Sequence, residues 1–206
     1  DNPALGRRGL RLSQVRTDLI DTQLEALAEA PERTGRDPYV MAPMVATPAE
    51  STWFAERARA AGIKTVGIMV EVPSTALRSA QVLEPVDFAS IGTNDLSQYT
   101  MAADRMASDL AQLTDPWQPA VLKLVQMAAQ AGQRAGKPVG VCGEAAADPL
   151  LACDRALELT SLVLCTAGAV GLYLAGYTDD EVVVVDNDKE TGEQLKRWPL
   201  LTNAEE

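Results

Sequence analysis

The chain of 206 residues contains no histidine. Imidazole titrates near neutral pH and is a frequent metal ligand, so its absence excludes histidine acid–base catalysis, histidine metal ligands and a phosphohistidine on this chain. Three cysteines are present, Cys142, Cys153 and Cys165, and none belongs to a Cys-x-x-Cys pair. This pattern is typical of reduced intracellular thiols rather than of a disulfide framework, and it favours a cytoplasmic protein.

Aromatic residues are also scarce, at 4% of the chain, so a buried core must be built mainly from Ala, Val, Leu, Ile and Met. Glycine-rich phosphate-binding loops of the P-loop or dinucleotide type are absent. Positive charge is limited as well, because 18 basic residues face 29 acidic ones and give a net charge of −11. This balance argues against nucleic acid or an anionic membrane as a partner. An anionic ligand would need local arginines or lysines.

The acidic excess is concentrated in the tail, and we therefore divide the chain into a domain at 1–178 and an acidic tail at 179–206. Just before the tail, Leu159–Thr178 carries no charge over 20 residues, about the length that spans a bilayer. Its three glycines and the lack of a following basic cluster favour a buried edge of the domain over a membrane span.

Short apolar runs alternate with amphipathic segments, which predicts βαβ units around a parallel sheet. We expect six strands, at Gly9–Leu12, Tyr39–Met44, Thr65–Glu71, Val86–Gly92, Val139–Gly143 and Leu159–Leu164. The chain is shorter than the roughly 250 residues of a complete eight-stranded α/β barrel. The predicted fold class is therefore α/β, an incomplete (β/α)8 TIM barrel with about six of its eight strands.

Helix boundaries are also marked in the sequence. Thr47-Pro48-Ala49-Glu50 is a capping box with proline at the first helical position. A helix is predicted at about 16–30, and another from Asp115 to Gly136. The last should bury the face formed by Trp117, Val121, Leu124, Val125 and Ala128.

Polar residues follow several of the predicted strands. Glu71 ends one strand, Asn94 and Asp95 follow the next, and Cys142 ends a third. In α/β barrels the carboxyl ends of the strands form the functional face, so these side chains should converge. Glu71 and Asp95 offer hard oxygen ligands that suit Mg²⁺ or Mn²⁺. The alternative is that Asp95 caps the following helix and Glu71 pairs with an arginine.

Arginines near these strands are candidates for binding phosphate or carboxylate oxygens. Arg8, Arg11 and Arg105 qualify because the planar guanidinium can bind two such oxygens at once, although a solvated basic edge is the alternative. Cys142 lies beside a glycine and a carboxylate, where a thiol can act as a proton donor or a nucleophile. It can equally be a small buried hydrophobic residue.

Five segments then resemble a known family in its own order. They are NPALGRRGLRL at 2–12, MAPMV at 41–45, GIMVEVP at 67–73, SIGTNDLSQYTMAADR at 90–105 and GVCGE at 140–144. The chain is similar to the carboxyl-terminal domain of enzyme I of the bacterial sugar phosphotransferase system, the phosphoenolpyruvate–protein phosphotransferase. The similarity extends from residue 1 to about 152.

The resemblance implies roles for matching residues. Glu71 and Asp95 would bind Mg²⁺, Arg8, Arg105 and Asn94 would bind the phosphoryl group of phosphoenolpyruvate, and Cys142 would protonate the enolate carbon to give pyruvate. It further implies a homodimer whose partners are a histidine-bearing domain and the phosphocarrier protein of the system.

The departures from the family are also informative. Two barrel strands and an arginine have no counterpart ahead of Asp1, and Tyr39 stands where the family has a phosphate-binding arginine. We therefore expect a truncated domain that is not competent alone. The alternatives are a non-catalytic dimerisation module, or a barrel of the pyruvate phosphate dikinase, phosphoenolpyruvate synthase or Mg²⁺-dependent aldolase kind.

Overall fold

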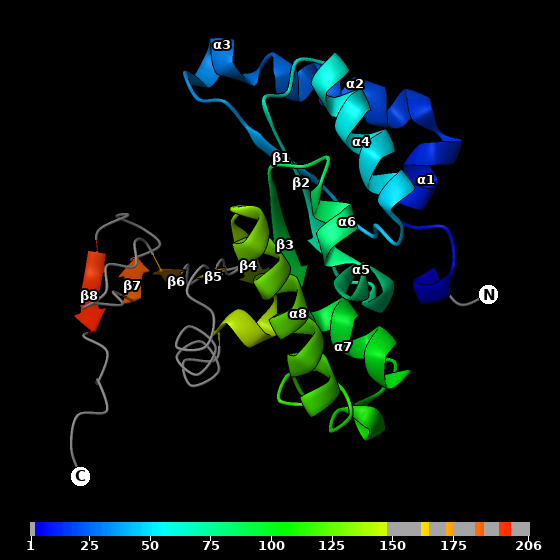
Figure 1. Cartoon of the computed structure of the whole chain (residues 1–206), viewed down its shortest axis with the longest axis vertical. Coiled ribbons are helices and arrows are strands. Elements are labelled where there is room, and N and C mark those ends of the chain that lie inside the picture. Colours follow the sequence, from blue (N-terminus) through cyan, green and yellow to red (C-terminus); the bar gives the residue numbers. More distant parts are fainter. Residues whose placement is uncertain (1–2, 148–161, 165–171, 175–183, 188–193, 199–206) are drawn as a thin grey trace.

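The computed structural model describes residues 3–147, 162–164, 172–174, 184–187 and 194–198. Its central element is a parallel sheet in the order β1-β2-β3-β4-β5 (Figure 1). The strands are β1 (Tyr39–Ala42), β2 (Thr65–Val70), β3 (Phe88–Gly92), β4 (Val139–Cys142) and β5 (Leu162–Leu164). Strands that neighbour each other in sequence are thus neighbours in space, as in a consecutive arc of an α/β barrel. Five of the six predicted strands are confirmed, of which β1 to β4 are shorter than predicted. The first residues of the strand predicted at Leu159–Leu164 lie outside the described residues.

The sixth prediction, a strand at Gly9–Leu12, is wrong. This segment opens the helix α1 (Leu10–Val15), which follows Gly9 at a φ of 52°. Leu10 is buried while Leu12 is 45% exposed, so the two leucines do not share a buried face as strand alternation would require. A run of four residues with two leucines is too short for periodicity to separate helix from strand.

Of the remaining helices, two precede β1 and the others connect the strands. They are α2 (Thr17–Ala28), α3 (Ala30–Thr34), α4 (Pro48–Ala60), α5 (Pro73–Leu77), α6 (Ser79–Leu83), α7 (Thr93–Met101) and α8 (Pro119–Ala135). Short 3-10 turns lie at η1 (Pro3–Leu5), η2 (Ser108–Leu110) and η3 (Glu144–Ala147). The predicted helix at 16–30 is confirmed as α2, which ends where α3 begins.

The core lies between the sheet and the helices α4, α5, α6 and α8. Strand residues such as Val66, Ile68 and Ile91 are fully buried there, together with Phe54 of α4. On β1, by contrast, Tyr39 is 73% exposed and Met41 40% exposed. The ring of Tyr39 lies 5.5 Å from that of Phe88 on β3. Helices therefore bury the core residues of the sheet, whereas Tyr39 and Met41 on β1 remain exposed in the described part of the chain.

The capping box at the start of α4 is confirmed. The Thr47 side chain accepts a hydrogen bond from the Glu50 N–H at 3.2 Å, and Glu50 Oε2 accepts one from the Thr47 N–H at 2.9 Å. Each residue thus satisfies a main-chain donor of the other in the first turn.

Replacing the Thr47 hydroxyl should destabilise the fold measurably. Thr47→Ala is expected to lower the free energy of unfolding by about 1 kcal/mol, because the first turn of α4 loses its side-chain acceptor. Urea unfolding checks this. Thr47→Ser is the matched control and should keep most of the stability, and an equal loss in both variants would contradict the role of the hydroxyl.

Helix α8 begins later than predicted. Its N-cap is Gln118 without a side-chain capping bond, while Asp115 Oδ1 accepts the Trp117 N–H at 2.9 Å in the turn before the helix. Trp117 is 39% exposed and lies outside the buried face. The other predicted face residues are buried, namely Val121, Leu124, Val125 and Ala128. Gly136 ends the helix as predicted, at a φ of 65°.

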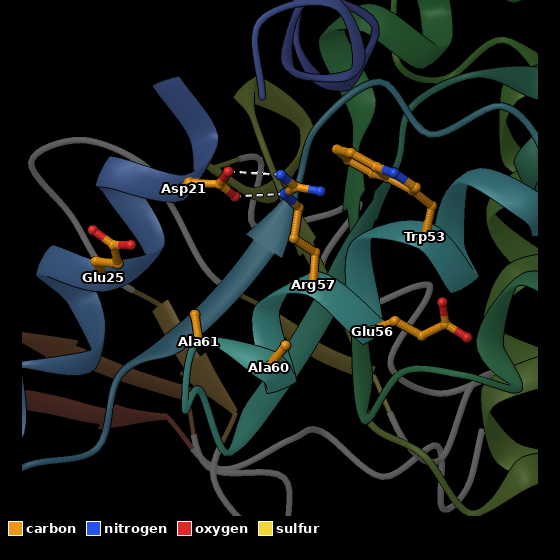
Figure 2. A pocket seen from close by; sticks show the side chains of 7 residues that line it. All are labelled: Asp21, Glu25, Trp53, Glu56, Arg57, Ala60 and Ala61. Carbon is orange, nitrogen blue, oxygen red and sulfur yellow. Dashed lines mark hydrogen bonds and ion pairs between the residues drawn. The ribbon is translucent and has the colours of Figure 1, made fainter. Parts of the chain in front are cut away.

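An ion pair joins α2 to α4 on the outside of the domain (Figure 2). Arg57 donates from Nε and Nη2 to the two carboxylate oxygens of Asp21, at 2.5 and 2.6 Å. The same guanidinium lies 5.3 Å from the ring centre of Trp53. The side chains border a cavity of about 500 Å³, lined by Asp21, Glu25, Trp53, Glu56, Arg57, Ala60 and Ala61. None of these belongs to the predicted site.

A second, antiparallel sheet is formed by β6 (Leu172–Leu174), β7 (Val184–Asn187) and β8 (Gln194–Trp198). The predicted boundary at 178/179 lies outside the described residues, as does most of the uncharged stretch Leu159–Thr178. Within the part of the chain that is described, no helix is long and apolar enough to cross a membrane.

Candidate functional site

The carboxyl ends of β2, β3 and β4 meet at one edge of the sheet. Val70 of β2 is in register with Ile91 of β3, and Gly92 of β3 with Cys142 of β4. Glu71 directly follows β2, and α7 directly follows β3. Because the three strands are parallel and adjacent, the polar residues after them lie close together, as expected for this class of fold.

Glu71 is buried and oriented by a main-chain donor. The residue is 4% exposed, and its Oε1 accepts the N–H of Met44 at 2.6 Å. Met44 follows β1 and has a φ of 60°, a left-handed conformation that non-glycine residues rarely adopt. The other oxygen, Oε2, faces Gly92, where an added Cβ would approach it to 2.9 Å. The carboxylate is thus fixed through one oxygen while the other faces the start of α7.

Asp95 lies in the first turn of α7, where a negative charge is favoured by the helix dipole. Its Oδ2 accepts a hydrogen bond from Arg8 Nη2 at 3.3 Å. Its Oδ1 is buried and has no hydrogen-bond donor among the described residues. Buried carboxylate oxygens are normally paired, so an unpaired one at this place requires an explanation.

The Arg8 segment is anchored to the same site. The hydroxyl of Tyr99, on α7, donates to the carbonyl of Ala4 in η1. Further along, the Leu10 N–H donates to the Pro43 carbonyl at 3.2 Å. These bonds hold the loop that carries Arg8 between α7 and the Met44 turn. Arg11 does not join the site in this way, since its guanidinium donates to the carbonyl of Gly6 at 3.3 Å.

Burial raises the pKa of the Glu71 carboxyl above its usual range. The N–H of Met44 acts in the opposite direction, and the neighbouring charge of Asp95 raises the pKa further. The positive charges of Arg8 and Arg105 lower it. Burial is thus the main cause of the raised pKa, and the charges of Asp95, Arg8 and Arg105 act on the same carboxyl.

Asn94 and Cys142 lie on the neighbouring edge of the same site. Asn94 Oδ1 accepts the N–H of Glu144 at 3.0 Å. The Thr93 hydroxyl donates to the Cys142 carbonyl at 3.0 Å, so α7 is tied to the end of β4. The Cys142 thiol donates to the Ile91 carbonyl at 3.4 Å. Glu71, Asn94, Asp95 and Cys142 therefore lie where β2, β3 and β4 end. Arg8 is joined to Asp95, and Arg105 lies in the turn after α7.

The donor set fits a hard divalent cation. Glu71 and Asp95 each commit one oxygen to the protein. Asp95 Oδ1 has no donor among the described residues, and Glu71 Oε2 lies beside Gly92 at the start of α7. No group of three or more His, Cys, Asp or Glu side chains that could hold a metal occurs among the described residues. Two carboxylates suit Mg²⁺, which usually keeps several waters and takes further ligands from substrate phosphates.

Several residues that shape the site were not predicted. Met44 acts through its main-chain N–H, and such donors leave no signal in the residue type. Gly143 has a φ of 96°, and a Cβ there would lie 2.6 Å from the Thr93 hydroxyl and 2.8 Å from Asn94 Oδ1. The glycine beside Cys142 was the available signal for a close approach of this kind. Gln98, which accepts the N–H of Arg105 in the turn after α7, was not predicted either.

Comparison with known proteins identifies the family. Residues 1–159 match the family described as "PEP-utilising enzyme, PEP-binding domain". A phosphoenolpyruvate-protein phosphotransferase of Streptomyces coelicolor is 54% identical over 168 residues, which cover 81% of this chain and 30% of that protein. A protein of the same name from Bacillus subtilis is 42% identical over 161 residues, covering 72% and 28%. The chain thus spans under a third of these curated relatives.

Solved structures agree with the fold. A citrate lyase from Burkholderia xenovorans superposes with a TM-score of 0.54 at 15% identity, over 70% of this chain and 50% of that one. At this identity the likeness concerns the fold alone, which is α/β of the TIM-barrel type. The match over residues 1–159 covers most of the chain, so the protein belongs to the family of phosphoenolpyruvate-binding domains of phosphoenolpyruvate-utilising enzymes.

Proposed function

We propose that the chain binds phosphoenolpyruvate together with Mg²⁺, as part of an enzyme that transfers the phosphoryl group to a protein histidine in the sugar phosphotransferase system. The observation that supports it most is the buried Asp95 Oδ1, which has no hydrogen-bond donor among the described residues, while Arg8 donates to the other oxygen of the same carboxylate at 3.3 Å. Anionic oxygens and a cation complement this arrangement, and the relatives' names give the reaction class.

Each residue has a defined task in this proposal. Glu71 and Asp95 would hold Mg²⁺, which would neutralise part of the negative charge of the substrate. Arg8 and Arg105 bind the phosphoryl oxygens, where preorganised positive charge stabilises the charge that develops during transfer. Asn94 presents its side-chain amide to the same group.

Cys142 provides the proton that completes the reaction. When the bond between phosphorus and the bridging oxygen breaks, the electron pair remains on that oxygen and gives the enolate of pyruvate. The enolate carbon then takes the proton of the Cys142 thiol, which is left as a thiolate. The sulfur lies 3.4 Å from the Ile91 carbonyl oxygen, where a neutral thiol can donate, and the neutral thiol is the form that a proton donor requires.

The accepting histidine belongs elsewhere, because this chain contains none. The same proposal includes a histidine-bearing domain and a phosphocarrier protein as partners, a homodimer as the assembly and the cytoplasm as the location. It also retains the division into a domain at 1–178 and an acidic tail at 179–206.

A calorimetric titration with phosphoenolpyruvate tests the proposal directly. We expect saturable binding in the presence of Mg²⁺ and at least about tenfold weaker binding without it, because the anionic ligand then meets two uncompensated carboxylates. The chain should be shown to be folded by circular dichroism. No heat in either condition would overturn the proposal and favour a non-catalytic dimerisation module, which sedimentation at several concentrations would detect.

A further inference from the structure

Gln98 is a buried amide on the helix that carries Asn94 and Asp95. It lies on α7, one turn after Asp95, and is only 8% exposed. A buried amide is normally retained because its polar atoms hold partners in place. The partners of Gln98 lie in the turn after the helix rather than in the core.

Both carbonyl oxygens of Gln98 bind that turn. The main-chain oxygen accepts the N–H groups of Ala102 and Ala103, the latter at 3.1 Å. The side-chain Oε1 accepts the N–H of Arg105 at 3.0 Å. Ala102 has a φ of 51°, so the chain reverses direction in a left-handed conformation that a non-glycine residue adopts only at a cost. Gln98 therefore links the main chain at Arg105 to the buried part of α7.

Ala103 is the buried residue of this turn, at 1% exposed, and the residues after it lie at the surface. Asp104, Arg105 and Met106 are exposed, and Met106 is 84% exposed. A contact within the turn, from the Met106 N–H to Asp104 Oδ1 at 3.0 Å, does not anchor it to the helix. Arg105 is also an arginine that the proposed function assigns to the phosphoryl group, so its position relative to α7 matters for the site. The Oε1 bond of Gln98 joins this exposed arginine to the buried site.

We infer that Gln98 is a positioning residue, which holds the main chain of Arg105 so that its guanidinium is directed at the anionic ligand. The inference rests on the proposed function of the site. In this arrangement α7 carries the proposed metal ligand Asp95 and also holds the main chain of Arg105 through Gln98. The distance between Asp95 and Arg105 is therefore fixed. An arginine that is already in position before the ligand binds increases affinity without adding a contact, because less freedom is lost on binding.

The test is a double-mutant cycle on the affinity for phosphoenolpyruvate with Mg²⁺, measured by calorimetry. Gln98→Met keeps the length of the side chain and removes the acceptor, and it should weaken binding about tenfold. In an Arg105→Ala background the same change should weaken binding less than about twofold, because the residue on which it acts is already absent. A purely structural role would give the same loss in both backgrounds.

The helix offers a matched control in Thr100. Its hydroxyl is buried without a hydrogen-bond partner among the described residues, so Thr100→Val removes a buried polar group that holds nothing. Its affinity should equal that of the unsubstituted chain. A loss at Thr100→Val as large as at Gln98→Met would overturn the inference, since any change within α7 would then have the same effect.

A second measurement does not depend on the ligand or on the variants. Hydrogen exchange of the Arg105 amide in the unsubstituted chain should be slowed, although the residue is exposed, because Gln98 Oε1 accepts its proton. Exchange at the rate of an unprotected amide would overturn the inference. Failure of the unsubstituted chain to bind phosphoenolpyruvate would overturn the proposed function itself, whereas binding with equal affinity by Gln98→Met would overturn only the role of Gln98.

Discussion

Glu71→Gln is expected to abolish Mg²⁺-dependent binding of phosphoenolpyruvate and, in the same protein, to raise the stability of the ligand-free fold. The amide can still accept the Met44 N–H, but it cannot supply an anionic oxygen to the cation. The carboxylate of the native residue is buried and its pKa is raised, so its ionised form is disfavoured in the folded state. Removing that charge should therefore increase the free energy of unfolding at neutral pH by on the order of 1 kcal/mol.

The sign of the pH dependence follows from the same shift. Because the pKa of Glu71 is higher in the folded than in the unfolded chain, the folded protein holds a proton that the unfolded one has lost. The contribution of Glu71 is thus fully present below the unfolded pKa and is lost as the pH rises through the folded pKa. The stability difference between Glu71→Gln and the native chain should grow as the pH rises from about 4.5.

Urea unfolding between pH 4 and 8, with and without Mg²⁺, measures both effects. Glu56→Gln is the matched control, because Glu56 is exposed on α4 and lies outside the site. It should change neither the binding nor the pH profile. Mg²⁺ should raise the stability of the native chain, by about 2.7 kcal/mol at a hundredfold excess over its Kd, and leave Glu71→Gln unchanged. Equal stabilisation of both proteins by Mg²⁺ would contradict the assignment of Glu71 as a ligand.

Gly143→Ala is expected to disrupt the site and to destabilise the fold by about 2–4 kcal/mol, from a combination of backbone strain and close contact. Gly143 has a φ of 96°, and the added Cβ would lie 2.6 Å from the Thr93 hydroxyl and 2.8 Å from Asn94 Oδ1. To relieve the overlap, the loop after β4 must move away from α7. That movement breaks the bond between Asn94 and the Glu144 N–H.

Gly136→Ala provides the matched control for this prediction. Gly136 also has a positive φ, 65°, but a Cβ there meets no atom within 4 Å. The control isolates the backbone strain, which should cost about 1–2 kcal/mol. Thermal unfolding and phosphoenolpyruvate binding should be measured for both variants. We expect Gly136→Ala to bind normally. An equal loss of stability and unchanged binding in both would show that the contact with Thr93 and Asn94 is unimportant.

Much of the fold was predictable because its signals are local. Capping boxes, positive-φ glycines and apolar runs of four to six residues mark α4, the end of α8 and the strands β1 to β4. The strand predicted at Gly9–Leu12 failed for the converse reason. Whether Leu12 is buried depends on how α1 packs, and that is a property of the assembled domain rather than of the segment.

The candidate site shows the same division. Glu71, Asp95 and Cys142 could be singled out because each lies at or just after the end of an apolar strand, and parallel strands bring such positions together. The Met44 N–H and the Gln98 amide were not identifiable. The first is a main-chain group that every residue except proline has, and the second acts on a turn whose direction the sequence does not specify. The candidate ligand-binding residues have characteristic types, whereas the residues that orient them are recognised by their contacts.

The left-handed Met44 also affects how tolerant this position is to sequence change. Its contribution to the site is an N–H vector, so no side-chain replacement other than proline removes it outright. In a saturation library selected for ligand binding, substitutions of Met44 should instead be ranked by two steric criteria. The first is tolerance of a φ near 60°. The second is fit against Gly9, because a Cβ added to Gly9 would lie 2.9 Å from the Met44 side chain. Glycine and asparagine meet the first criterion and β-branched residues fail it. Alanine scanning would therefore classify Met44 as a packing residue, and only an amide-to-ester replacement of its peptide group would expose its electrostatic role.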